Sequence, residues 1–213
     1  MMSLRCLPAS LSCIAMVAVM LGLMSGCAGL SRPSPVKQTY LLQAPPATQA
    51  ATAPRPGTLK VGTISVAAPF RGKSLVYREG DLKFESDFYN EFFVAPSSML
   101  TESAAAWLAT AGIFKEVLPA GANADGNFVL EGFVSELYGD YRDVARPAAV
   151  LTGKFFLIDN RVLSGVPTWQ TELKQRVSIS SRSPDALAAG FNSAWAAMLG
   201  DLARELAAAR LAP

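Results

Sequence analysis

Histidine is absent from this sequence of 213 residues, and cysteine occurs only at Cys6, Cys13 and Cys27. Without histidine the commonest general base at neutral pH is missing, so Ser-His-Asp, Cys-His and His-metal sites are excluded. Beyond Cys27 the chain has no thiol, and therefore no disulfide, thiolate nucleophile or Cys-based metal site. The commonest catalytic classes are thus ruled out by composition.

Clusters of positive charge are also lacking. Lys and Arg total 19 against 17 acidic residues, which gives a formal net charge of only +2. Proteins that bind nucleic acid usually carry a clustered basic face, and no run of basic residues occurs here. We therefore expect no nucleic-acid partner.

The N-terminus has the pattern of an export signal. Arg5 precedes residues 11–24, "LSCIAMVAVMLGLM", which are nearly all apolar. A membrane-spanning helix needs about 20 apolar residues, so this shorter run, with small residues at its end, predicts a signal peptide over residues 1–26. No later run is both long enough and sufficiently free of charge to span a membrane.

Cys27 follows the apolar run directly. The motif "MSGC" resembles a bacterial lipobox, in which the cysteine is acylated and becomes the first mature residue, although Met24 stands where Leu is more usual. The alternative is ordinary cleavage after Ala28, which would discard Cys27. Ala28 in place of Asp favours, by resemblance to sorted lipoproteins, the periplasmic face of the outer membrane. Several acyl chains on one cysteine suffice for stable anchoring in outer-membrane lipids.

Residues 27–57 are predicted to be the lipidated cysteine and a tether rich in Pro and Ala. The stretch "APPATQAATAPRPG" (44–57) has almost no bulky apolar side chains and cannot form a core of its own. One possible edge strand, "QTYLL" (38–42), interrupts the tether. The folded domain is therefore expected to occupy residues 58–210.

The periodicity within that domain alternates between strand and helix. Strands are predicted at 59–67, 87–96, 114–118, 127–138, 148–159 and 168–180, with a hairpin at 74–85. A first helix runs from Pro96 to Gly112, with Ser97 or Ser98 as its N-cap, and a second begins at Ser183. The second helix has one long apolar stripe, formed by Leu187, Phe191, Trp195, Met198, Leu202 and Leu206.

These elements predict an α+β fold, a largely antiparallel but mixed β-sheet with two helices packed on one face. The step from the 87–95 strand through the first helix to 114–118 suggests a parallel strand pair with a right-handed crossover. The three long strands that follow suit an antiparallel meander.

Carboxylates are the remaining candidates for catalysis. Glu79/Asp81, Glu85/Asp87 and Asp140/Asp143 are paired in sequence, but each pair falls at a turn or strand end, where acidic side chains simply remain solvated. The stretch "GANADG" (121–126) lacks the context and the lysine of a phosphate-binding loop. We therefore expect no enzyme, no cofactor and no metal.

The aromatic stretch "YNEFFVAPSSML" (89–100) is more unusual. Phe92 and Phe93 are adjacent and point to opposite faces of a strand, whereas the helices can cover only one of them. Either a loop buries the other face, or that face meets a protein partner or a lipid. Tyr89, Phe92 and Phe93 are therefore the candidate partner- or lipid-contact residues.

The segment "LVYREGDLKFESDFYNEFFVAPSSMLTESAAAWLATAGIFKEVLP" resembles the ABC-type transport auxiliary lipoprotein family (PqiC-like), and the resemblance extends over roughly residues 38–208. Many members have Trp in the aromatic cluster where this chain has Phe. The matching positions are Arg78, Tyr89, Phe92, Phe93, Pro96, Met99, Leu100, Leu108, Gly112, Phe114 and Val117.

The resemblance implies an outer-membrane-anchored, non-enzymatic auxiliary subunit of an MCE-type ABC lipid transport system. Such a subunit docks the MCE-domain protein that bridges the periplasm to a permease and its ATPase, and it forms a homo-oligomeric ring. The alternative is a structural or assembly lipoprotein of the envelope, similar to the TolB N-terminal domain or to LptE, with no role in transport.

Overall fold

The computed structural model describes residues 36–48, 51, 53–162 and 165–210, and its compact unit begins at Val36. The predicted signal peptide and Cys27 lie outside the described residues. The strands are β1 (Gln38–Tyr40), β2 (Arg55–Val66), β3 (Ser74–Arg78), β4 (Phe84–Phe92), β5 (Phe114–Leu118), β6 (Phe128–Asp140), β7 (Ala148–Asp159) and β8 (Pro167–Ser178). The helices are α2 (Pro96–Ala111) and α3 (Pro184–Ala208), with a short 3-10 turn at Ala68–Phe70.

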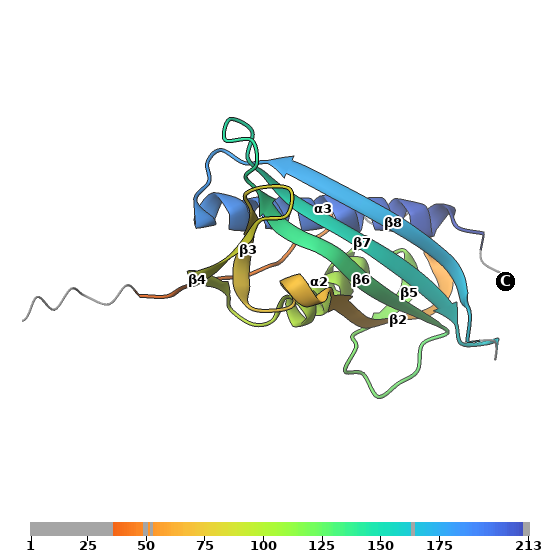
Figure 1. Cartoon of the computed structure of the whole chain (residues 1–213). Coiled ribbons are helices and arrows are strands. Elements are labelled where there is room, and N and C mark those ends of the chain that lie inside the picture. Colours follow the sequence, from red (N-terminus) through yellow and green to blue (C-terminus); the bar gives the residue numbers. More distant parts are fainter. Residues whose placement is uncertain (1–35, 49–50, 52, 163–164, 211–213) are drawn as a thin grey trace, which may run out of the picture. The chain divides into compact units, whose positions relative to one another are not determined.

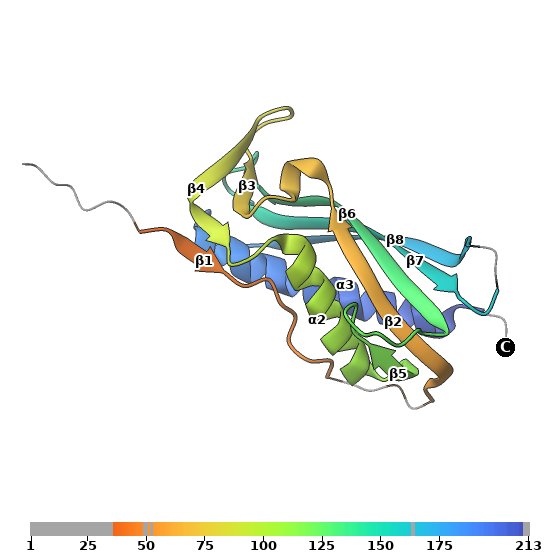
Figure 2. The ribbon, with the colours of Figure 1, turned by 90° about the horizontal axis from the view of Figure 1, so that it is seen from below.

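The eight strands form one mixed sheet that forks at β6 (Figures 1 and 2). On one side β6, β7 and β8 form the predicted antiparallel meander. On its other side β6 pairs first with β2, from Phe128 to Val134, and then with β3, at Gly139 and Asp140. The first branch continues from β2 to β5, and the second continues from β3 through β4 to β1. The α+β prediction is confirmed.

Both helices contribute their apolar stripes to one hydrophobic core. α2 contacts β2 and β5, α3 contacts β7 and β8, and the two helices contact each other. Every member of the predicted α3 stripe is buried, with Trp195 packed 6.4 Å from Phe155 of β7, centroid to centroid. Ser183 caps α3 as predicted, because its hydroxyl accepts a hydrogen bond from the Ala186 amide at 3.2 Å.

The predicted C-terminal end of α2 is confirmed, but its predicted N-cap is not. Gly112 adopts a left-handed conformation (φ 63°) and stops the helix as predicted. The N-cap is Ala95, with no side-chain hydrogen bond, so the prediction of Ser97 or Ser98 as the cap is wrong. Pro96 at the first helical position starts the helix, since its ring presets the backbone and it has no amide donor to satisfy.

Ser97 instead helps to hold α2 on a β-bulge of β2. The β2–β6 register shifts between Val61 and Ile64, and the pairing resumes with Ile64 opposite Gly132. The Thr101 hydroxyl accepts the Ile64 amide at 2.9 Å, and the Ser97 hydroxyl donates to the Ile64 carbonyl at 2.6 Å. Two helix hydroxyls thus satisfy the amide and the carbonyl of the residue that follows the bulge.

Two further predictions about the strands need correction. β4 and β5 do not pair; β5 lies parallel to β2, while β4 lies between β3 and β1. The second arm of the predicted 74–85 hairpin and the predicted strand at 87–96 form one continuous strand, β4. β4 and β5 are not neighbours because β2, which precedes both of them in the sequence, occupies the position beside β5.

The segment predicted as a tether folds onto the domain well before residue 58. β1 confirms the predicted edge strand, pairing parallel with β4. Leu42 is buried, and the Gln43 and Ala44 amides donate to Asn192 Oδ1 (2.9 Å) and Ser103 Oγ (3.0 Å). One bulky apolar side chain, together with side-chain acceptors on both helices, is enough to fix a segment that is otherwise rich in Pro and Ala.

Candidate functional site

The adjacent Phe92 and Phe93 have opposite environments, as the alternation of a strand requires. Phe92 is only 2% exposed and its ring lies 6.0 Å from that of Phe191 on α3. Phe93 is 59% exposed and Tyr89 is 44% exposed. The inclusion of Phe92 among the candidate contact residues therefore has to be corrected, because Phe92 belongs to the core, whereas Tyr89 and Phe93 remain available for contact.

Phe88 is also exposed, although a regular strand would place it on the same side as Phe92. A regular ladder between β3 and β4 would continue from Val76↔Ser86 to Ser74↔Phe88, but Ser74 pairs with Glu91. β4 therefore contains a bulge of three extra residues, and this bulge turns Phe88 toward solvent with 69% of its surface exposed. The ring of Phe88 meets that of Tyr89 edge to face at 5.1 Å.

Asp87 holds this bulge together. Its Oδ1 accepts the backbone amides of Tyr89 (2.8 Å) and Asn90 (2.9 Å), and its Oδ2 accepts the Asn90 side-chain amide (2.9 Å) and the Tyr77 hydroxyl (2.5 Å). Burial alone would raise the pKa of Asp87, but these hydrogen bonds hold it below its ordinary value. The acidic residue that sequence reasoning assigned to a solvated turn is a structural element of the bulge.

We call Phe88, Tyr89, Phe93 and Val94 the aromatic patch. Two lysines flank it, and both pair with Glu91: Lys37 at 3.2 Å and Lys73 at 3.4 Å. The Lys37 ammonium also lies 4.9 Å from the centre of the Phe88 ring. The hydrogen bond from Lys37 is the main cause that lowers the pKa of Glu91. The patch thus combines exposed aromatic rings with a nearly balanced set of charges.

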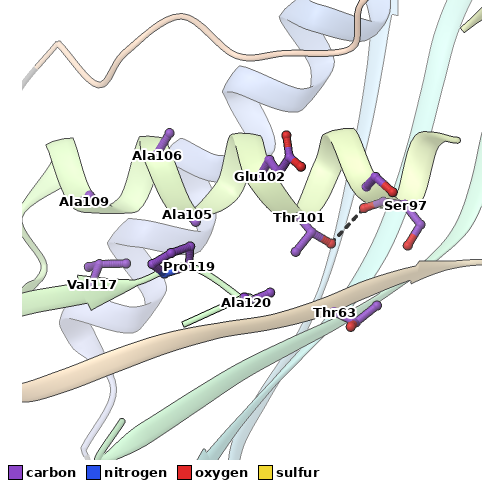
Figure 3. Close-up of a pocket in the computed structure, with 12 residues that line it drawn as sticks. Thr63, Ser97, Thr101, Glu102, Ala105, Ala106, Ala109, Val117, Pro119 and Ala120 are labelled. Atoms are coloured by element: carbon purple, nitrogen blue, oxygen red, sulfur yellow. Dashed lines mark hydrogen bonds between the residues drawn. The ribbon is translucent and has the colours of Figure 1, made fainter. Parts of the chain in front are cut away.

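A second apolar surface lies along α2 (Figure 3). It is a groove of about 610 Å³ between α2, residue Thr63 of β2 and the segment that leaves β5. Most of its lining is small or apolar, and Glu102 is its charged member. We call it the α2 groove, and its lining residues are Thr63, Ser97, Ser98, Thr101, Glu102, Ala105, Ala106, Ala109, Val117, Pro119, Ala120 and Gly121.

The paired carboxylates are largely engaged by arginines. Asp140 lies at the end of β6, is almost completely buried, and accepts hydrogen bonds from Arg142 (2.9 Å) and Arg176 (2.5 Å). The hydrogen bond from Arg142 is the largest of the effects that bring the pKa of Asp140 far below its usual range. Asp143, its neighbour in sequence, pairs separately with Arg146 at 2.6 Å.

The hairpin carboxylates have separate partners as well. Glu79 pairs with Arg182 at 2.5 Å, and Asp81 lies 3.5 Å from Arg142. Within the described ranges, no group of three His, Cys, Asp or Glu side chains is placed to bind a metal ion. In the same part of the chain, no helix is both long and apolar enough to cross a bilayer.

Sequence reasoning found Tyr89 and Phe93 but missed Phe88 and the α2 groove. Phe88 stands beside Tyr89 in the sequence, yet strict alternation places it on the same face as Phe92, which is buried, and the bulge that exposes Phe88 has no clear sequence signal. The groove could have been suspected from the small residues of "ESAAAWLATA" (102–111). Small side chains on a helix leave a groove only if the facing segment does not pack closely against them. The sequence does not reveal how closely that segment packs.

The sequence matches no family model and no curated protein. Among solved structures, the fold is similar to that of a Xanthomonas campestris protein described by the DUF330 family model, with a TM-score of 0.68 at 17% identity, covering 78% of this chain and 92% of that one. A second structure, of an uncharacterized protein, gives 0.64 at 18% identity and covers 80% of this chain and 99% of that one. At these identities the likeness establishes the fold alone.

A PelC dodecamer from Paraburkholderia phytofirmans gives a TM-score of 0.41 at 22% identity, covering 73% of this chain and 92% of that chain. That similarity is too low to support a common fold or a common assembly. The likeness of fold rests on the first two structures, and the described residues have the fold of the DUF330 protein.

Proposed function

We propose that this chain is a lipid-anchored envelope protein that acts by contact rather than by catalysis. More specifically, it is a non-enzymatic auxiliary subunit of an MCE-type ABC lipid transport system. It is held at the periplasmic face of the outer membrane by acylated Cys27, and it docks the MCE-domain protein that connects to the permease and its ATPase.

The observation that carries this proposal is the exposure of apolar surface on well-ordered main chain. Phe88 and Phe93 are more than half exposed although Phe88 stands in the bulge fixed by Asp87 and the Phe93 amide, just after β4, is bound to the Tyr40 carbonyl. Contiguous apolar surface on a soluble domain marks contact with a protein, a membrane or a ligand. Meanwhile Asp140, Asp143 and Glu79 are occupied by arginines, which suits structural roles.

The docking surface that we assign to the MCE protein is the α2 groove. Its lining of alanines, Pro119 and Val117 offers an apolar hollow on a rigid helix, and Glu102 adds one charge that can orient a partner. Homo-oligomerisation belongs to the same proposal. β8 pairs only with β7 among the described strands, so its outer edge has main-chain groups that a second copy can use.

Co-purification from membranes tests the partnership. The tagged chain is cross-linked in cells, and the captured proteins are identified by mass spectrometry. We expect an MCE-domain protein to be recovered with the wild type and to be lost with Ala106→Arg, which places a long cationic side chain in the groove. Ala189→Arg is the matched control, because Ala189 is an equally exposed alanine on α3.

Two results would contradict the proposal. Recovery of the MCE protein at the same level with Ala106→Arg would remove the groove as its docking surface. Recovery of outer-membrane assembly or structural proteins, with no MCE protein, would instead support an envelope lipoprotein without a transport role.

A further inference from the structure

The aromatic patch lies where the chain from Cys27 enters the fold. β1 is the first strand of the described structure, and it pairs along its length with β4 (Figure 2). The Phe93 amide donates to the Tyr40 carbonyl at 2.8 Å, and Lys37, just before β1, covers the Phe88 ring. The strand that follows the tether is therefore in direct contact with the patch.

The tether limits how far the patch can be from the anchor. Residues 28–37 separate Cys27 from β1, and ten residues span at most about 35 Å when fully extended. An acylated Cys27 is embedded in the bilayer, so this length keeps β1 and the neighbouring patch within that distance of the membrane surface. The patch therefore belongs, together with the exposed Val36 and Leu41 at the two ends of β1, to the apolar groups that this short path connects to the anchor.

The composition of the patch is typical of the membrane interface. Tyrosine rings concentrate at the level of the lipid headgroups, phenylalanine is common on the apolar face of interfacial segments, and lysines can place their ammonium groups among the phosphates. Lys37 and Lys73 share a single partner, Glu91, so the local charge is nearly balanced. Such a surface suits a largely zwitterionic bilayer and depends little on salt.

We propose that the aromatic patch is a second membrane contact, inserted at the headgroup level of the lipid bilayer beside the acyl anchor. This inference rests on the proposed anchoring at Cys27. The bulge held by Asp87 fixes the backbone of Phe88 and Tyr89, so insertion does not require this segment to become ordered. The two contacts together would set the orientation of the domain, whereas a single acyl anchor would not.

Flotation of a chain without its lipid tests the patch independently of acylation. Residues 27–213 carrying Cys27→Ser are mixed with vesicles of phosphatidylethanolamine with a minor share of phosphatidylglycerol and spun in a density gradient. We expect a fraction of this protein to float, and each of Phe88→Ser and Phe93→Ser to lower the partition coefficient by about tenfold. Both side chains are largely exposed, so melting curves should be unchanged.

Phe133→Ser is the matched control, because Phe133 is 42% exposed but stands on β6, in the centre of the sheet. It should leave flotation unchanged. Absence of flotation, or an equal loss with Phe133→Ser, would overturn the inference. So would loss of self-association or of MCE binding in the Phe88 and Phe93 variants with unchanged flotation, because the patch would then be a protein interface. Failure of anchoring at Cys27 would appear only in the acylated protein, which this experiment does not use.

Discussion

Replacing Gly190 by Ala should destabilise the domain, although the same change in a helix interior usually stabilises it. Gly190 is a buried residue of α3, on the side of the helix that faces β7. A Cβ atom at this position would lie 2.5 Å from Ile179 Cγ2 and 2.9 Å from Ala149 Cβ. The Ile179 methyl can rotate away, but the Ala149 Cβ is fixed to the backbone of β7 and can move only with the strand.

The two opposing effects can be compared directly. Ala in place of Gly gains about 0.5–1 kcal/mol of helix stability. Overpacking of a close contact costs about 1–3 kcal/mol, because α3 must lift away from the sheet over its buried stripe. We therefore expect Gly190→Ala to lower the free energy of unfolding by about 1 kcal/mol, which lowers Tm by about 2–4 °C in a domain of this size.

Gly200 provides the internal control. It lies in the same helix, but nothing lies within 4 Å of the position of its Cβ, so Gly200→Ala should gain only the helix stability of Ala over Gly and raise Tm by about 1–4 °C. Thermal and urea unfolding of both variants gives the comparison. Stabilisation by both substitutions would refute the close packing of α3 on β7, because that packing is the one feature that separates them.

Three further predictions concern the strands. Phe92→Ala should cost about 3–5 kcal/mol in urea unfolding and Phe93→Ala less than about 0.5 kcal/mol; equal losses would mean that Phe93 is buried too. Thr101→Val should cost about 1–3 kcal/mol, because the Ile64 amide is left without its acceptor; an unchanged midpoint would show that the bulge has no need of it. The folded-state pKa of Asp140 lies below its unfolded value, so its contribution to stability is full above about pH 4 and is lost as the pH falls further. Asp140→Asn should therefore lower stability at neutral pH by about 3 kcal/mol and flatten the acid limb of the stability–pH curve; an unaltered acid limb would contradict this.

Elements governed by local periodicity could be predicted from the sequence. In α3, the Ser183 cap and the stripe from Leu187 to Leu206 describe both where the helix starts and which face is buried. In β8, alternation from Trp169 to Val177 separates the helix-facing side from the wet side. In both cases the information lies within a few residues of the position in question, so a single sequence is sufficient.

Non-local pairing could not be predicted in the same way. β5 is parallel to β2 because a strand some 50 residues earlier reaches it, and nothing in "FKEVL" specifies this neighbour. The packing of Gln43 and Ala44 depends on acceptors at Ser103 and Asn192, which lie far away in the sequence. The composition of this segment, which is rich in Pro and Ala, therefore predicted a tether without contacts to the domain.

The candidate site falls between these two cases. Opposite directions for Phe92 and Phe93 follow from the two-residue period of a strand and were predicted, whereas the sequence left open whether a loop covers the second face. The exposure of Phe88 depends on three extra residues in β4, and these are stabilised by hydrogen bonds from Tyr77 and Asn90 to Asp87. A bulge shifts the register without changing composition, so strict alternation from Phe92 places Phe88 on the wrong side.

The anchor is the premise on which both the transport role and the membrane contact depend, and the mass of the mature amino terminus tests it most directly. The protein is purified from envelope membranes in detergent, digested, and its N-terminal peptide is measured by mass spectrometry. The account predicts a peptide that begins at Cys27 and carries the added mass of its acyl chains, and it predicts that Cys27→Ser abolishes this species and releases or misprocesses the protein. An unmodified amino terminus at Gly29 would contradict it.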